Sequence, residues 1–141
     1  MPNHCCNTLF LNTDSLSLIV NKYIRKDENR QDIFDFERIL QVGDGPDWYE
    51  QRLDKWGTNT FGYDLCIGES TIDFFTAWTP PIPIINKLAE LHKDFVFHLE
   101  YFETGNAFRG IYTARMRKER VFVEDQSWNM TDKDFVDLGL V

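Results

Sequence analysis

The sequence predicts an α+β fold in which helices pack mainly on one face of an antiparallel sheet. Segments with a strand-like period of two and segments with the helical period of about 3.6 residues are mixed without strict alternation, which favours an antiparallel sheet. Aromatic residues make up 15% of the chain and include twelve phenylalanines. Rings of this size suit the pleated surface of a sheet that packs against helices.

We expect one domain over residues 1–141, with an irregular insert around residues 27–62. A chain of 141 residues suits one hydrophobic core and is short for two. A chain of this length buries about 68–70% of its unfolded surface, so the fold needs no metal ion or disulfide to support it.

The first half of the chain predicts one strand and two helices. Residues 4–12 read as a strand with apolar side chains on both faces. A helix with N-cap candidates at residues 13–15 follows. Its amphipathic stripe is complete, at Leu16, Ile19, Val20, Tyr23 and Ile24. The charged residues 25–30 are typical of a solvated loop. Residues 33–42 are apolar without clean periodicity, so a short strand and an irregular packing segment both stay open.

The second half predicts two hairpins and two or three short helices. Tyr49, Leu53 and Trp56 lie on one face of a short helix that ends at Gly57. Strands are expected at residues 63–67, 71–77, 95–102, 107–116 and 121–123. Prolines at positions 80, 81 and 83 prevent the second of these strands from continuing and favour the start of a helix. A short closing helix is expected within residues 131–140.

The net charge of −8 disfavours broad electrostatic binding to nucleic acid or to an anionic membrane. Simple solubility accounts for this charge, and an acidic surface that engages a basic partner is the more specific alternative. The N-terminus lacks the pattern of a signal peptide, and no apolar run approaches the roughly 18 residues that cross a bilayer. We therefore expect a cytoplasmic protein without a membrane partner.

The three cysteines do not predict a metal site. Cys5 and Cys6 are adjacent, so on a strand they point to opposite faces, and Cys66 is distant in sequence. Together with His4, His92 and His98 they lack the spacing of zinc ligands. We expect no metal and no cofactor, and we expect the cysteines to act as small buried apolar residues.

Several motifs occur together in an order that is similar to a known family. They are residues 1–3 (Met-Pro-Asn) followed by Cys5 and Asn7, residues 56–58 (Trp-Gly-Thr), residues 77–81 (Ala-Trp-Thr-Pro-Pro), Phe97–Glu103 and residues 105–110. In these motifs the chain resembles the YubB-like proteins of enterobacterial plasmids and phages, which contain a ferredoxin-like domain. The resemblance implies a ferredoxin-like topology and an origin on a mobile element. It implies no catalytic residues and no iron–sulfur cluster.

The chain also departs from that family at two places. His4 stands where the family tends to have tryptophan, and Asn59 and Thr60 stand where it often has lysine and tryptophan. A ligand shared with the family at this turn is therefore not implied.

Among the possible functions, the sequence favours a non-enzymatic accessory protein that binds a host or phage protein and modulates or counters a host system. Tryptophan dominates the energetics of many interfaces, and a bare sheet face can present further rings. The candidate contact residues are Trp48, Trp56, Trp78, Tyr63 and Phe102. Packing in the core is the alternative for the tryptophans.

Two other functions receive less support. A small hydrolytic or ligand-binding enzyme would use carboxylates on the sheet, and the candidates are Asp64, Asp73, Glu100 and Glu103. Binding of nucleic acid would use exposed rings that stack on bases, with candidates Tyr63, Phe75, Phe102 and Tyr112. The acidic charge disfavours nucleic acid, and the sequence contains no established catalytic motif.

Overall fold

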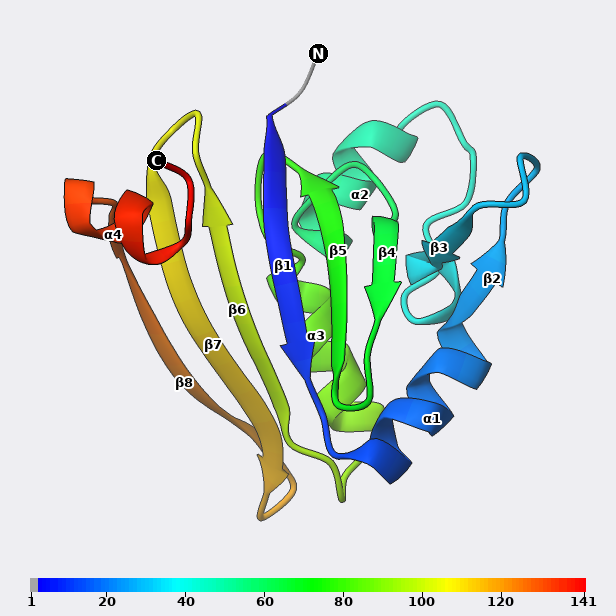
Figure 1. Cartoon of the computed structure of the whole chain (residues 1–141). Helices are drawn as coiled ribbons and strands as arrows, with labels where there is room; N and C mark the ends of the chain where they lie inside the picture. Colours follow the sequence, from blue (N-terminus) through cyan, green and yellow to red (C-terminus); the bar gives the residue numbers. More distant parts are fainter. Residues whose placement is uncertain (1–2) are drawn as a thin grey trace.

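The computed structural model describes residues 3–141, so Met1 and Pro2 of the N-terminal motif lie outside the described residues (Figure 1). The main sheet has six antiparallel strands in the order β4-β5-β1-β6-β7-β8. These strands are β1 (His4–Phe10), β4 (Tyr63–Ile67), β5 (Thr71–Ala77), β6 (Phe97–Glu103), β7 (Phe108–Arg117) and β8 (Arg120–Asn129). A small second sheet pairs β2 (Ile24–Lys26) with β3 (Asp32–Phe34).

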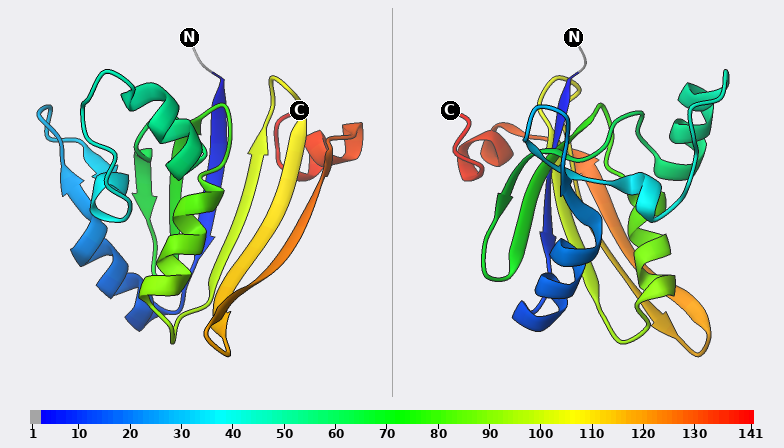
Figure 2. Two further views of the ribbon diagram at one scale, coloured as in Figure 1. Left: turned by 180° about the vertical axis from the view of Figure 1, so that it is seen from behind. Right: turned by 90° about the vertical axis from the view of Figure 1, so that its right-hand side faces the viewer.

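The helices are distributed unequally between the two faces of the main sheet. They are α1 (Thr13–Tyr23), the short η1 (Phe36–Arg38), α2 (Trp48–Trp56), α3 (Ile82–Leu91) and α4 (Asp132–Asp137). The right-hand view of Figure 2 shows α2 and α3 on one side of the sheet and α4 on the other. The predicted α+β class, with an antiparallel sheet and helices mainly on one face, is confirmed.

The core lies between this helix-covered face and the helices. Alternate residues of β1 and β6 point into it, as their burial shows. The large side chains that are almost fully buried come from strands, helices and the insert alike: Trp56, Tyr23, Phe34, Phe36, Phe74, Phe97, Leu9, Ile19, Ile72, Ile84, Ile85 and Leu88. Burial of each of these side chains contributes about 1.5–3 kcal/mol relative to its exposure to water.

Helix α1 begins one residue earlier than its predicted caps. The side chain of Asn12 accepts a hydrogen bond from the Ser15 backbone N–H at 2.9 Å, so Asn12 is the N-cap. Leu16, Ile19 and Tyr23 are buried, as the amphipathic spacing predicts.

The prediction of a solvated loop at residues 25–30 is wrong at its start. Residues 24–26 form β2, which returns through a turn to β3. The Asp27 side chain closes this turn by accepting the backbone N–H groups of Asn29 and Gln31. Arg25 pairs with the buried Asp35 at 2.6 Å. The charge of Arg25, which predicted a solvated loop, therefore helps to hold the insert together.

The last strand was predicted too short. β8 covers Arg120–Asn129 and pairs with β7 at every position, whereas the sequence suggested only residues 121–123. Most of its side chains are exposed on both faces, so the strand carries no alternation of apolar and polar residues. Pairing with β7 determines its length instead.

The tryptophan motifs join the end of α2 to the end of β5. Gly57 caps α2 in the left-handed conformation, with φ of 79°. The Thr58 hydroxyl donates to the Ala77 carbonyl at 2.8 Å, and the Ala77 backbone N–H donates to the Thr60 hydroxyl at 3.0 Å. These bonds hold the Trp-Gly-Thr turn and the Trp-Thr-Pro-Pro corner together.

No helix in the described part of the chain is long and apolar enough to cross a membrane.

Candidate functional site

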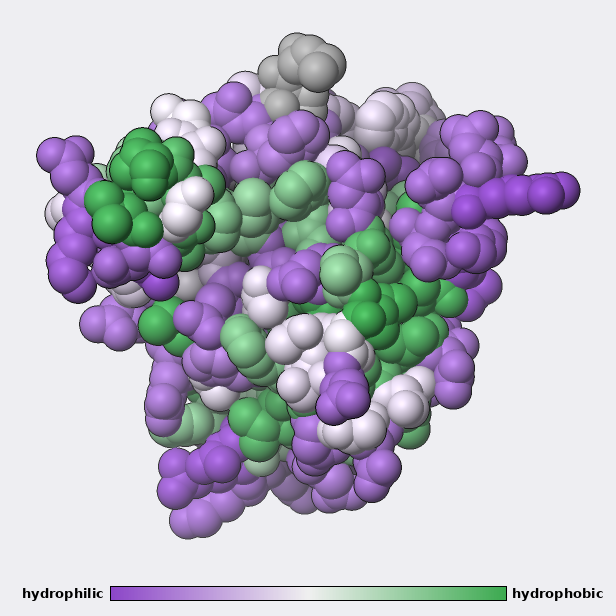
Figure 3. Space-filling view, in the orientation of Figure 1, coloured by the Kyte–Doolittle hydropathy of each residue, from purple (hydrophilic) through white to green (hydrophobic). Residues whose placement is uncertain are grey.

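The face of the main sheet that α2 and α3 leave uncovered is the open face, and the strand register arranges its side chains in rows. One row, the aromatic row, crosses all six strands: Tyr63, Phe75, Cys6, Phe102, Arg109 and Trp128. The row beside it contains Cys66, Asp73, Thr8, Glu100, Ile111 and Gln126. Figure 3 looks onto this face and shows hydrophobic patches separated by hydrophilic ones.

The β4 end of the aromatic row is a cluster of three rings. His4 lies 5.5 Å from the Tyr63 ring and 5.2 Å from the Phe75 ring, measured between centroids. Tyr63 and Phe75 meet edge to face. Burial raises the pKa of Tyr63, with a smaller contribution from Asp64, so its hydroxyl stays protonated and shares a hydrogen bond with His4 Nδ1.

The β8 end of the aromatic row is fixed by an ion pair. Arg109 lies over the Trp128 ring and pairs with Asp134 of α4 at 3.0 Å. Asp134 also accepts hydrogen bonds from Trp128 Nε1 and from the backbone and side chain of Thr131. The backbone hydrogen bond from Thr131 contributes most to lowering the pKa of Asp134, so this carboxylate stays charged and fastens α4 at this end.

A shallow hollow lies between α4 and the middle of the open face. It has a volume of about 200 Å³, and Leu138 reaches it from the segment after α4. Thr8, Phe10 and Phe102 line the side formed by the sheet. The centre of the aromatic row is therefore accessible from solvent, and its rings are half-buried.

Two carboxylates lie next to the aromatic row. Thr8 is directly opposite Asp73 on one neighbouring strand and Glu100 on the other. The Thr8 hydroxyl donates to Asp73 at 2.6 Å, and Glu100 lies 3.7 Å from His98 Nε2. Within residues 3–141 neither carboxylate forms an ion pair with lysine or arginine, so both contribute negative potential to this face.

The predicted contact residues are found in four separate places. Tyr63 and Phe102 lie in the aromatic row. Trp56 is 0% exposed, and its Nε1 donates to the Leu40 carbonyl at 2.7 Å, so Trp56 belongs to the core and is not a surface contact. Trp48 and Trp78 are 41% and 42% exposed, on α2 and at the end of β5 respectively.

Trp48 already has an intramolecular partner. Arg52 lies 4.8 Å from the Trp48 ring and 4.8 Å from the Trp56 ring, with Phe61 at 5.0 Å. Burial lowers the pKa of Arg52, and these rings stabilise its charge where water is partly excluded. Trp48 therefore covers an arginine on the side of the molecule away from the open face.

The four carboxylates that suggested a hydrolytic site do not share a cleft. Glu103 is buried and accepts the backbone N–H groups of Gly105 and Asn106, so it closes the turn between β6 and β7. Asp64 sits at an irregularity of β4 with φ of 52°, beside Lys26 and Asp32 of the small sheet. Only Asp73 and Glu100 remain on the open face.

Cys5 and Tyr112 have structural roles, and the prediction that the cysteines are buried is right for Cys5 but wrong for Cys66, which is exposed. Burial raises the pKa of the Cys5 thiol and, less strongly, that of Cys6, so both stay protonated and are poor nucleophiles. Tyr112 lies on the core side of β7 and donates to Asn86, so it is absent from the aromatic row. Among residues 3–141 no three histidine, cysteine or acidic side chains converge on a position for a metal ion.

The sequence did not reveal that Arg109 and Trp128 belong to the same row as Tyr63. Their alignment depends on β1 lying between β5 and β6, which is a non-local pairing. Trp128 was missed because β8 was predicted too short. The sequence offers only the alternation of residues along each strand. Alternation predicts which face of the sheet a side chain lies on, but not which residues of neighbouring strands lie opposite it.

An antiparallel sheet with helices gathered on one face, ending in a meander of β6, β7 and β8, defines a protein of the α+β class. Residues 54–136 match the model of the ferredoxin-like domain in Api92-like proteins, and the chain belongs to this family. The match includes the tryptophan motifs and the aromatic row from Tyr63 to Trp128, but not β1. No curated protein and no solved structure matches the chain.

Proposed function

We propose that this chain is a non-enzymatic binding protein whose open face receives a basic, extended segment of another protein. The observation that supports this function is the aromatic row together with Asp73 and Glu100 beside it. Half-buried rings attract both apolar side chains and the cationic ends of arginine and lysine. Carboxylates next to such rings, with no lysine or arginine partner within residues 3–141, favour a partner with positive charge.

The dimensions of the row suit an extended peptide. Neighbouring strands lie about 4.8 Å apart, so a row across six strands is roughly 24 Å long. An extended chain rises about 3.3 Å per residue, so a segment of roughly seven residues spans the row. The ion pair of Arg109 with Asp134 leaves little free positive charge within the row.

The same charges disfavour nucleic acid on this face. Asp73, Glu100 and Glu124 present negative charge, and the whole chain carries −8. Phosphate groups are repelled by such a surface, because binding of nucleic acid depends on neutralisation by lysine and arginine. The positive charges of this face outside the row, Arg115, Arg117 and Arg120, lie towards the tip of the β7–β8 hairpin, away from the aromatic row.

The biological setting is part of the same proposal. The motifs shared with YubB-like proteins support an accessory protein of a plasmid or phage that acts in the cytoplasm of a bacterial host. In that setting the partner is a host or phage protein, and binding modulates or counters a host system. A hydrolytic activity is not favoured, because the candidate carboxylates are scattered.

The proposal is tested by mapping chemical shifts of the ¹⁵N-labelled protein with three short probes. A peptide of alternating arginine and leucine is the basic probe, the same peptide with glutamate in place of arginine is its matched control, and oligothymidylate represents nucleic acid. We expect the basic peptide alone to shift the amides of Phe75, Phe102 and Glu100. Shifts confined to α2, or larger shifts with oligothymidylate, contradict the proposal.

A further inference from the structure

The strand β8 forms a long and regular outer edge of the main sheet. Its ten residues pair with β7 without a bulge, and within residues 3–141 no strand lies on its other side. The strand contains neither proline nor lysine, the residues that commonly protect such an edge. Phe122 and Val123 are 38% and 37% exposed. α3 contacts β8 from the core face, and Figure 1 shows α4 beside one end of β8 only, so α4 leaves the outer edge free over the half that begins at Arg120.

The opposite edge of the sheet is protected. β4 has five residues, and its register with β5 is interrupted between Tyr63 and Cys66. Phe34 of β3 also pairs with Gly62 next to β4, so the small sheet covers this edge. Of the two edges of the main sheet that the structure describes, β8 is therefore the one that offers a continuous row of backbone groups for pairing.

The turn before β8 determines which backbone groups point outward. Lys118 and Glu119 have φ of 50° and 66°, which is the geometry of a tight two-residue hairpin turn. Arg117 and Arg120 close this hairpin, so the N–H and C=O of Arg120 point toward β7. The groups of Val121 and Val123 then point away from the sheet, because the direction alternates along the strand.

We propose that a second copy of this chain pairs with β8 in antiparallel fashion, about a two-fold axis at Phe122. In this register Phe122 lies opposite itself, and Val121 lies opposite Val123 with their outward groups hydrogen-bonded. Arg120 of each copy lies opposite Glu124 of the other, so the arrangement forms two equivalent ion pairs. Glu119 faces Asp125 in this register, but Glu119 belongs to the hairpin turn and lies outside the paired strand. Arg117 lies 5.0 Å from the Phe122 ring and covers it from the same copy.

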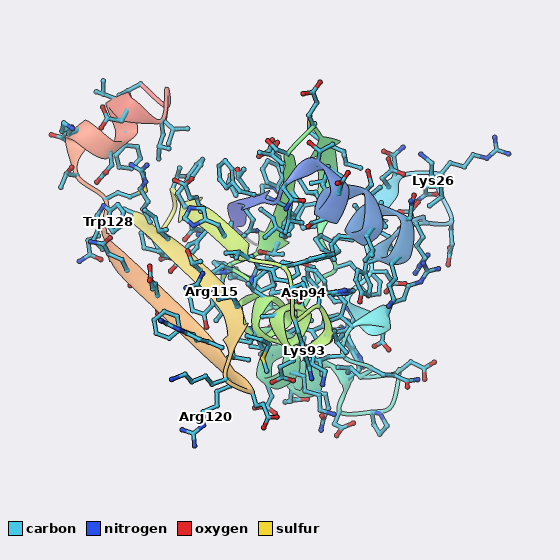
Figure 4. The ribbon with its side chains drawn as sticks, turned by 90° about the horizontal axis from the view of Figure 1, so that it is seen from below. Lys26, Lys93, Asp94, Arg115, Arg120 and Trp128 are labelled. Carbon is cyan, nitrogen blue, oxygen red and sulfur yellow. The ribbon has the colours of Figure 1, made fainter. Side chains whose placement is uncertain are left out.

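The neighbouring registers are unfavourable. An axis at Val123 places Phe122 opposite Glu124, an axis at Glu124 brings two glutamates together, and an axis at Asp125 brings two aspartates together. Like charges directly opposite each other destabilise an antiparallel pair, whereas opposite charges stabilise it. The sequence Arg-Val-Phe-Val-Glu at residues 120–124 is therefore self-complementary when it is reversed. Figure 4 shows Arg120 at the outer edge of the hairpin, pointing away from the rest of the molecule.

The test is sedimentation equilibrium of the full chain over a series of protein concentrations. We expect a dimer that dissociates on dilution. Arg120→Glu and Glu124→Arg are each expected to weaken dimerisation about tenfold, because each creates two repulsive pairs. The double variant R120E/E124R restores the ion pairs with reversed sign and is expected to restore dimerisation. Lys93→Glu, which changes the net charge as Arg120→Glu does, is the matched control and is expected to leave dimerisation unchanged.

A backbone variant tests the pairing directly. Val123→Pro removes an N–H that points to solvent in the monomer, so the fold is expected to survive and the dimer to be lost. Circular dichroism checks the fold. A wild-type chain that stays monomeric at every concentration overturns the proposal. If Val123→Pro still forms the dimer, or if R120E/E124R fails to restore dimerisation, the proposed register is wrong. None of these outcomes depends on the function proposed for the open face.

Discussion

Burial shifts the pKa of several single residues in this protein, and His92 is one whose shift affects stability near neutral pH. Its Nε2 shares a hydrogen bond with the Tyr23 hydroxyl at 2.7 Å, and its ring stacks on Phe95. Burial, and then the charge of Lys22, lowers the pKa of His92 below its ordinary value of 6.5. The folded protein therefore favours neutral His92.

The pH dependence of stability follows from this shift. The folded state binds fewer protons at His92 than the unfolded state does, so its contribution is complete above about pH 6.5 and is lost as the pH falls through the lower folded-state pKa. Urea unfolding between neutral and mildly acidic pH is expected to show this loss. In His92→Gln the slope of unfolding free energy against pH is expected to be shallower. An identical slope in both proteins would show that His92 is not responsible.

Helix α2 carries one tryptophan in the core, Trp56, and one at the surface, Trp48. Trp56 is fully buried against Phe36 and Phe61, whereas Trp48 covers Arg52 from outside. Trp56→Ala is expected to cost about 3–5 kcal/mol of unfolding free energy, the usual cost of a large core truncation. Trp48→Ala is expected to cost less than about 1.5 kcal/mol. Equal losses in urea titrations would contradict these two roles.

The hydrogen-bonded junction between the end of α2 and the end of β5 leads to a second prediction. A Cβ at Gly57 would lie 2.8 Å from Pro83 Cδ, and the residue also has φ of 79°. Gly43 has φ of 81° with nothing near its Cβ position, so Gly43→Ala measures the backbone cost alone. That cost is about 1–2 kcal/mol. Thermal or urea unfolding is expected to show a larger loss for Gly57→Ala, and equal losses would mean that the junction adapts to the clash.

Elements with a buried face were predictable from their pattern. The strand at residues 71–77 matches β5, where burial on one side forces alternation. The strand at residues 63–67 matches the bounds of β4, although an irregularity between Tyr63 and Cys66 breaks its alternation. Most of β8 was missed, because its side chains are largely exposed and its pairing with β7 determines its length. β2 was missed because Ile24 continues the apolar stripe of α1 in sequence, whereas in the structure it pairs with Phe34 of β3. Tyr63 and Phe102 were recognised as candidates for a surface, but the aromatic row required the register of six strands, which residues far apart in sequence determine.

At the scale of the whole molecule, one sheet supplies two different surfaces. Its open face presents the aromatic row and two carboxylates, and its outer edge presents β8. The helices cover the other face, and α4 is fastened by Asp134 at the end of the open face. If β8 pairs with a second copy, the two open faces become parts of one continuous sheet, so a dimer offers two copies of the aromatic row to one partner assembly.

The affinity of the arginine–leucine peptide for three variants shows whether the open face binds a basic segment. Phe102→Ala removes a ring from the centre of the aromatic row, the double variant D73N/E100Q removes the charges beside it, and Trp48→Ala changes the opposite side of the molecule. Isothermal titration is expected to show binding weakened about tenfold by each of the first two changes and unaffected by the third. Equal affinity in all three variants, or a loss in Trp48→Ala alone, would contradict the assignment of binding to the open face.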